Sequence, residues 1–187
     1  MRIISGNFKN KKLFEPNDSY TRPLKDLVKE SIFNIIEHSK LVKFKIENCE
    51  VLDLFSGSGS FGLECISRGA KKVLFCEKHI PVIKILNKNI ANLKCKEKTS
   101  IYVQDVFELL NNKSFSKNKF QIIFLDPPFK EKKINELLEN LNKSNILDKK
   151  GMIILHRNKK YRDSLPQKFK IELEKTYGLS KIIFGSF

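Results

Sequence analysis

The chain has 187 residues, enough for one α/β domain with a sizeable core. Its 36 Lys and Arg residues outnumber 21 Asp and Glu residues, and this net charge of +15 favours a polyanionic partner such as nucleic acid. Genomic codon bias is an alternative source of the excess lysine. No apolar run approaches membrane-span length and the chain does not begin with a signal-peptide pattern, so we expect a cytoplasmic protein.

The first 20 residues combine a short β-like run at residues 2–4 with a Gly-Asn pair, and they predict a hairpin. This stretch has a basic face that suits the phosphates of a nucleic acid, and its members are Arg2, Lys9, Lys11 and Lys12. A solvated, mobile terminus is the alternative interpretation.

A helix is predicted from about residue 24 to residue 36 by apolar residues at steps of three and four. These residues are Leu24, Leu27, Val28, Ile32, Ile35 and Ile36. Arg22 lies just before this helix, and residues 40–50 form a lysine-rich connector. We expect residues 1–45 to form an RNA-contacting extension and helix packed on a single globular domain, residues 46–187.

Residues 51–62 are the stretch around which the chain is organised. An apolar strand carrying Asp53 runs into a glycine-rich turn and then a helix, which is the opening of a nucleotide-cofactor site. The spacing of Gly57, Gly59 and Gly62 also fits a dinucleotide fingerprint, with Glu77 as its acidic residue. A carboxylate just before the loop suits a cationic ligand better than a pyrophosphate, because like charges repel.

Two further strands are predicted at residues 72–77 and 100–103, separated by a helix at residues 79–93. Glu77, at the end of the first, is placed to accept hydrogen bonds from ribose hydroxyls, although a plain surface carboxylate is the alternative. Asp105, after the second, is a candidate N-cap of a short helix.

Residues 120–125 form an apolar run that predicts a buried strand. Asp126-Pro127-Pro128-Phe129 ends it and holds a carboxylate and an aromatic ring at the strand's carboxyl end, where open α/β sheets bind ligands. A helix at residues 132–141, a strand at 151–156 and a hairpin around Gly178 complete the prediction. Carboxylates therefore lie at the carboxyl ends of four of these strands, at Asp53, Glu77, Asp105 and Asp126.

The cysteines and histidines give no metal signal. Cys49, Cys65, Cys76 and Cys95 lack Cys-x-x-Cys spacing and are expected to be reduced thiols. His38, His79 and His156 are scattered, so we expect surface or internally hydrogen-bonded histidines and no metal.

The Asp126–Phe129 turn together with the Asp53–Gly59 loop resembles S-adenosylmethionine (SAM)-dependent methyltransferases that modify exocyclic amino groups of bases. The resemblance is closer to the bacterial guanine-N2 methyltransferases of small-subunit (16S) ribosomal RNA. It is carried by residues 2–6, 11–13, 22–23, 26–34, 52–59, 62–64, 67–70 and 126–129. The last third of the chain matches only in pattern.

This resemblance implies a Rossmann-like α/β fold with a mostly parallel seven-stranded sheet, an antiparallel C-terminal hairpin and a short N-terminal hairpin and helix. It implies a monomer that methylates guanine N2 in 16S ribosomal RNA or in the assembling small subunit. The cofactor SAM would be held by Asp53, Phe55, Ser56, Gly57, Gly59, Glu77, Lys78, Asp105 and Val106. The catalytic residues would be Asp126, Pro127, Pro128 and Phe129, and RNA would meet Arg2, Lys9, Lys11, Lys12 and Arg22. Leu24 departs from the family, which usually has Thr there.

Other functions remain open. Asp-Pro-Pro followed by an aromatic residue also serves adenine-N6 methylation of DNA or RNA, whereas protein-glutamine methylation usually goes with Asn in place of Asp126. An NAD-dependent oxidoreductase would use the glycine loop and Glu77 but leaves the Asp126 turn unexplained. A non-catalytic RNA-binding protein would need neither feature.

Overall fold

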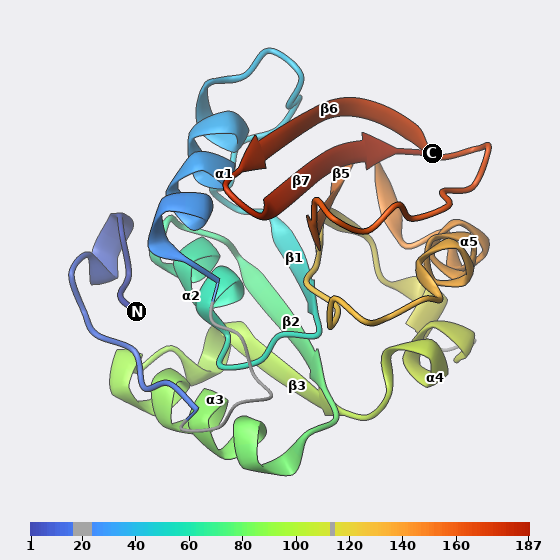
Figure 1. Cartoon of the computed structure of the whole chain (residues 1–187). Helices are drawn as coiled ribbons and strands as arrows, with labels where there is room; N and C mark the ends of the chain where they lie inside the picture. Colours follow the sequence, from blue (N-terminus) through green and yellow to red (C-terminus); the bar gives the residue numbers. More distant parts are fainter. Residues whose placement is uncertain (17–23, 113–114) are drawn as a thin grey trace.

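In the computed structural model, which describes residues 1–16, 24–112 and 115–187, seven strands form one sheet (Figure 1). Their order across the sheet is β3-β2-β1-β4-β5-β7-β6. The strands are β1 (Glu50–Leu54), β2 (Lys72–Glu77), β3 (Thr99–Val103), β4 (Phe120–Leu125), β5 (Leu147–Asn158), β6 (Lys170–Tyr177) and β7 (Ser180–Ser186).

The first five strands run parallel, and the C-terminal hairpin adds the antiparallel part. β1 pairs with β2 and β4, β2 with β3, and β4 with β5, all in parallel register. β7 lies antiparallel between β5 and β6, and Gly178, with φ of +59°, turns the chain between β6 and β7. The predicted mostly parallel Rossmann-like sheet with an antiparallel C-terminal hairpin is therefore confirmed.

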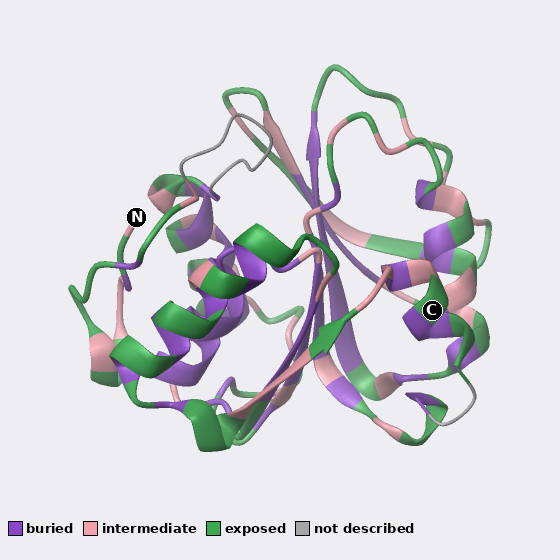
Figure 2. Ribbon diagram, turned by 90° about the horizontal axis from the view of Figure 1, so that it is seen from below, coloured by how far each residue is buried: buried purple, intermediate pink, exposed green. Residues whose placement is uncertain are grey.

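Helices cover both faces of the sheet (Figure 1). They are α1 (Asp26–His38), α2 (Ser60–Ser67), α3 (Ile80–Leu93), α4 (Val106–Asn111) and α5 (Ile134–Ser144). The apolar side chains of α1, α2 and α3 pack in one buried cluster, and those of α4 and α5 pack in a second. The sheet separates these two clusters and is itself buried along its middle (Figure 2). Its strands are apolar on both sides for this reason.

The face that α1 buries differs in part from the prediction. Leu27 is 68% exposed, so its assignment to the buried face was wrong, whereas Phe33 is completely buried and stacks on Phe61 with ring centroids 5.1 Å apart. The helix begins at Asp26, and its buried stripe follows Val28, Ile32 and Ile36. Leu27 lies one residue, about 100° of helix rotation, from Val28 and points away from the sheet.

The predicted N-terminal hairpin is present and is anchored to the domain. A single antiparallel bridge joins Arg2 and Lys12, and Ile3 and Leu13 insert into the core. The buried Glu64 carboxylate accepts hydrogen bonds from the main-chain N–H groups of Ile4 and Ser5, at 2.7 and 2.9 Å. These contacts fix the basic hairpin on α2.

All four cysteines are buried and unpaired, as predicted. Burial raises the pKa of Cys49 to about 11 and that of Cys76 to about 12. These two side chains therefore remain neutral thiols at neutral pH and act as core residues.

Two negative observations hold for the described ranges. None of the helices there is long and apolar enough to cross a membrane. Nor do three or more His, Cys, Asp and Glu side chains gather there as metal ligands would. The absence of a metal, like the domain boundary near residue 45, remains a prediction.

Candidate active site

A cleft of about 1060 Å³ opens at the carboxyl edge of the parallel strands. β1 and β4 are neighbours at its centre, and the strand order reverses between them. Such a switch point is where open α/β sheets bind ligands. The structure brings together here all four strand-end carboxylates singled out from the sequence, namely Asp53, Glu77, Asp105 and Asp126.

Asp53 lies at the floor of the cleft and is 1% exposed. Its Oδ2 atom accepts a hydrogen bond of 2.9 Å from the main-chain N–H of Gly62, in the first turn of α2. Burial raises the pKa of this carboxyl well above its usual range; the Gly62 bond opposes the shift, and the charges of Asp126 and Glu77 add to it. A cationic group in the cleft would relieve this cost.

The glycine loop packs so closely on its neighbours that Gly59 and Gly62 have no room for a side chain. Gly59 has φ of +83°, and a Cβ there would lie 2.4 Å from the Cδ1 atom of Leu86. A Cβ on Gly62 would lie 2.4 Å from the ring of Phe75. β2 and α3 therefore hold the loop close against the sheet.

Ser56, in the same loop, has an unusual hydroxyl. Its main-chain N–H donates to the carbonyl of Cys76 at 3.1 Å, but its Oγ atom is buried and has no hydrogen-bond partner among the described residues. A buried hydroxyl without a partner costs free energy. Because Ser56 lines the cleft, a polar ligand atom is a suitable partner for it.

Glu77 is fixed by main-chain groups at the end of β2. Its Oε2 atom accepts from Gly57 N–H at 3.1 Å, and its Oε1 atom accepts from Lys78 and His79 N–H at 2.8 and 2.9 Å. A carboxylate has about four acceptor positions, so these bonds orient Glu77 and leave limited capacity for a ligand hydroxyl.

Asp105 is the N-cap of α4, as predicted. Its Oδ1 atom accepts from Phe107 N–H at 2.9 Å, and its Oδ2 atom from Lys78 Nζ at 2.8 Å. Partial burial raises the pKa of Asp105, but the Lys78 and Phe107 hydrogen bonds outweigh it and leave that pKa below its usual range. The neighbouring Val106 is buried and offers an apolar surface to the cleft.

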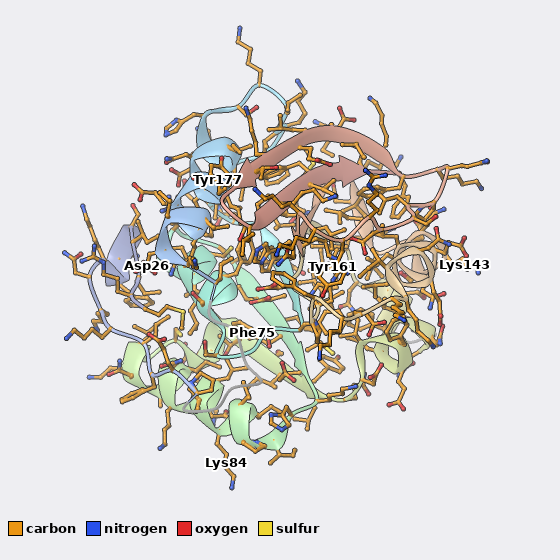
Figure 3. All side chains as sticks on the ribbon, viewed as in Figure 1. Asp26, Phe75, Lys84, Lys143, Tyr161 and Tyr177 are labelled. Carbon is orange, nitrogen blue, oxygen red and sulfur yellow. The ribbon has the colours of Figure 1, made fainter. Side chains whose placement is uncertain are left out.

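The turn after β4 projects into the cleft with Asp126, Pro127, Pro128 and Phe129 all on its lining. Asp126 is 20% exposed, and its Oδ1 atom lies 2.8 Å from Nδ1 of His156, whose Nε2 lies 2.9 Å from the Ser180 hydroxyl. The ring of Phe129 meets the His156 ring edge-on, with centroids 5.5 Å apart. Tyr161, 42% exposed, lines the cleft from the segment after β5 and lies near the centre of the view in Figure 3.

The sequence-based prediction gave no site role to His156 or Arg157, yet both contact the Asp126 turn; His156 is internally hydrogen-bonded, as one of the two expected alternatives. Arg157 is 1% exposed and donates to the carbonyls of Pro128, Phe129 and Glu131. The available signal was their position, since both lie near the carboxyl end of β5, at the edge of the sheet where the carboxylates gather.

The basic residues assigned to RNA lie away from the floor of the cleft. Arg2, Lys9, Lys11 and Lys12 are exposed on the N-terminal hairpin. Arg22 lies outside the described residues. Pro16 and the buried Leu24, on either side of that gap, both line the cleft, so the N-terminal extension forms part of its wall.

This sheet order, with a ligand cleft at its switch point, is the fold of Rossmann-like methyltransferases. The model of the family described as "Conserved hypothetical protein 95" matches residues 1–186, and the chain belongs to this family. It is 34% identical over 180 residues to "Ribosomal RNA small subunit methyltransferase D" of Haemophilus influenzae, covering 96% of this chain and 90% of that protein.

A relative of the same name from Escherichia coli K12 is 31% identical over 153 residues, covering 82% of this chain and 72% of that protein. Among solved structures, the Escherichia coli protein yhhF, which carries a methyltransferase assignment, superposes with a TM-score of 0.83 and is 27% identical. That superposition covers 99% of this chain and 96% of yhhF. The resemblance to this methyltransferase family is therefore confirmed across almost the whole chain.

Proposed function

We propose that this protein transfers a methyl group from SAM to the exocyclic N2 amino group of a guanine in 16S ribosomal RNA. The observation that carries the proposal is Asp126, a partly exposed carboxylate held at the switch-point cleft with one oxygen engaged by His156. The names of the Haemophilus influenzae and Escherichia coli relatives support small-subunit ribosomal RNA as the substrate.

The residues of the cleft fit SAM. The Ser56 hydroxyl, which has no partner in the part of the chain that the structure describes, and the buried Asp53 suit the polar, cationic amino-acid end, and Glu77 suits the ribose. Asp105 and Val106 offer an acceptor and an apolar surface for adenine. When bound, SAM supplies an electrophilic methyl group on its sulfonium.

The acceptor chemistry then falls to the Asp126 turn. The lone pair of guanine N2 is delocalised into the ring, so the amino group must be oriented toward the methyl. Hydrogen bonds from N2 to the Oδ2 atom of Asp126 and to the carbonyl of Pro127 provide this positioning and electrostatic stabilisation. As the N–C bond forms and the S–C bond breaks, one N2 proton passes to Asp126 or to water.

Phe129 and the basic N-terminal hairpin are the parts of the protein that would meet the RNA. Stacking of the target base on Phe129 is worth roughly 1–3 kcal/mol. The base must be splayed out of the RNA to enter the cleft, which is easiest in an unpaired region. Arg2, Lys9, Lys11 and Lys12 on the hairpin then contact phosphates, and the chain acts as a cytoplasmic monomer, with residues 1–45 as the RNA-contacting extension.

The test is methyl transfer from labelled SAM to small-subunit ribosomal RNA, free and protein-bound, taken from cells that lack this enzyme. Label in N2-methylguanosine supports cofactor, acceptor atom and RNA class together. Label in N6-methyladenosine would support methyltransferase activity but would show that the target base is adenine and not guanine. If neither substrate is labelled although SAM binds, the acceptor is DNA or protein; a thermal shift with NAD but not with SAM would indicate an oxidoreductase.

A further inference from the structure

The catalytic turn is held from β5 at two consecutive positions. His156 and Arg157 end the apolar run of this strand, and Leu155 pairs in register with Leu125, the residue before Asp126. Successive residues of a strand point to opposite faces. Met152 and Ile154 belong to the core cluster on the α1–α3 face, whereas Ile153 and Leu155 belong to the cluster on the α4–α5 face. His156 and Arg157 therefore reach the turn from opposite faces of the sheet.

His156 determines how Asp126 presents its carboxylate. An ionised carboxylate only accepts hydrogen bonds, so Nδ1 of His156 must donate to Oδ1 of Asp126 across their 2.8 Å separation. In this Nδ1–H tautomer, Nε2 accepts from the Ser180 hydroxyl at 2.9 Å. His156 is 5% exposed, and the Phe129 ring stands against it. Among the described residues, Oδ2 of Asp126 has no hydrogen-bond partner, so it is the oxygen left for an acceptor group.

Arg157 holds the other end of the turn. Its Nη1 donates to Pro128 O at 3.0 Å, and its Nη2 donates to Phe129 O and Glu131 O at 3.3 and 2.9 Å. Nε and Nη2 also pair with both carboxylate oxygens of Asp163, at 2.9 and 2.8 Å. A planar guanidinium has five N–H donors in a fixed arrangement. The Arg157 side chain can therefore hold all three carbonyl oxygens in fixed positions around one guanidinium.

We propose that His156 and Arg157 are positioning residues for methyl transfer, His156 by aiming the Oδ2 atom of Asp126 at the acceptor amino group and Arg157 by fixing the Pro128–Phe129 segment that carries the stacking ring. This inference rests on the proposed function, because it assigns Asp126 and Phe129 their roles. Misplacement of a reacting group by about 1 Å can cost on the order of 10²-fold in rate. Loss of the His156 or the Arg157 side chain should therefore lower kcat strongly. Substitution of either residue should leave SAM affinity unchanged, because neither His156 nor Arg157 lines the cleft.

The experiment compares steady-state methylation of ribosomal RNA by wild-type protein, His156→Ala and His156→Asn, with SAM affinity and the melting temperature of each. An Asn amide can place a donor near the position of Nδ1. We expect His156→Ala to lose on the order of 10²-fold in kcat at unchanged SAM affinity and little changed KM for RNA. His156→Asn should recover part of that loss. Equal kcat for wild type and His156→Ala, or no recovery in His156→Asn, would overturn the role of His156.

Matched variants separate positioning from folding. His38→Ala changes an exposed histidine at the end of α1 and should leave kcat unchanged. Ser180→Ala removes only the second hydrogen bond of the His156 ring, so it supplies an independent answer if His156→Ala fails to fold. We expect Ser180→Ala to lower kcat by less than His156→Ala.

For Arg157, the charge-conserving Arg157→Lys should lower kcat, because an ammonium group cannot donate to three carbonyls in one plane. The exposed Arg162→Lys should leave kcat unchanged. A wild-type kcat for Arg157→Lys would overturn its role.

A second readout does not depend on turnover. ¹⁵N NMR of labelled histidine should show His156 as the Nδ1–H tautomer with a slowly exchanging proton, and that protection should disappear in Asp126→Ala. An Nε2–H tautomer in the wild-type protein would overturn the inference even if the enzyme is active. If the wild-type protein shows the Nδ1–H tautomer but transfers no methyl group, the proposed function would be overturned. The His156–Asp126 hydrogen bond would then have only a structural role.

Discussion

The side chain of Asn89 binds both main-chain polar groups of Phe14, although 75 residues separate them. Its Oδ1 atom accepts from Phe14 N–H at 2.7 Å, and its Nδ2 atom donates to Phe14 O at 3.1 Å. The same Nδ2 atom donates to the carbonyl of Ser58 at 3.0 Å. One completely buried amide on α3 thus ties the N-terminal extension to the glycine loop of the cleft.

Replacing Asn89 should therefore loosen both segments. We expect Asn89→Ala to lower the free energy of unfolding by about 1–3 kcal/mol, since it leaves main-chain groups of Phe14 and Ser58 without their partner. Urea denaturation measures the loss, and faster amide exchange at Phe14 locates it. Asn87→Ala, exposed on the same helix, should change stability by less than about 0.5 kcal/mol. Equal stability of the two variants would show that the Asn89 amide is not needed.

Removal of the Asp126 carboxylate should abolish turnover without releasing SAM. We expect Asp126→Ala to lose at least about 10²–10³-fold in kcat, because the amino group loses its acceptor, while the Kd of SAM stays near the wild-type value. Single-turnover methylation and calorimetric titration measure the two quantities. Asp148→Ala, outside the cleft, serves as the control. Turnover that survives in Asp126→Ala would remove its assigned role.

Asp53 should make stability fall as pH rises. Its pKa is raised in the folded protein, so the folded state binds the proton more tightly than the unfolded state. Its contribution to stability is therefore present below the unfolded pKa, about 3.9, and is lost as pH rises toward the folded pKa. Asp53→Asn, which keeps an acceptor for Gly62 N–H, should gain in melting temperature relative to wild type between pH 4 and pH 7.

The same variant tests the cofactor assignment. Without the negative charge, Asp53→Asn should bind SAM more weakly than wild type at pH 7, as measured by calorimetry. Unchanged SAM affinity would remove Asp53 from the cofactor site. A gain in melting temperature that does not vary with pH would instead contradict the raised pKa.

Gly62 should not tolerate even a methyl group. In Gly62→Ala the new Cβ would lie 2.4 Å from the Phe75 ring and 2.7 Å from Val73, so α2 must shift away from β2. Overpacking of this kind costs about 1–3 kcal/mol, which offsets the higher helix propensity of Ala. Thermal unfolding measures the change. A Gly62→Ala variant as stable as wild type would mean that α2 moves at no cost.

The basic hairpin should act on RNA affinity rather than on chemistry. Lys11→Ala combined with Lys12→Ala should weaken RNA binding and reduce the salt dependence, with the log–log slope falling by about 0.7 per lost phosphate contact. Binding titrations at several salt concentrations measure this. Lys84→Ala and Lys143→Ala remove similar charges from α3 and α5, where both lysines project outward (Figure 3). If all four lysines contribute equally, binding reflects net charge and not the hairpin.

The order of elements could be predicted because apolar runs, glycine turns and prolines are local signals. The strand over residues 120–125 and the turn after it were placed correctly for this reason, as was the N-cap at Asp105. The buried face of α1 was predicted less well. Apolar spacing gave Leu27 and Val28 equal weight, and only the packing of α1 on the domain, where Phe33 stacks on Phe61, buries Val28 and leaves Leu27 exposed.

By itself the sequence determined the family, the sheet and the four carboxylates at its edge, because residues at strand ends keep their place in any packing of a parallel sheet. Only the tertiary structure decided which carboxylate oxygens at that edge already accept hydrogen bonds from other parts of the chain. Asp126 meets His156 across 30 residues, and Asn89 meets Phe14 across 75. Such pairs depend on strand register and helix docking, which set side-chain distances to within an ångström and leave no periodic pattern in the chain.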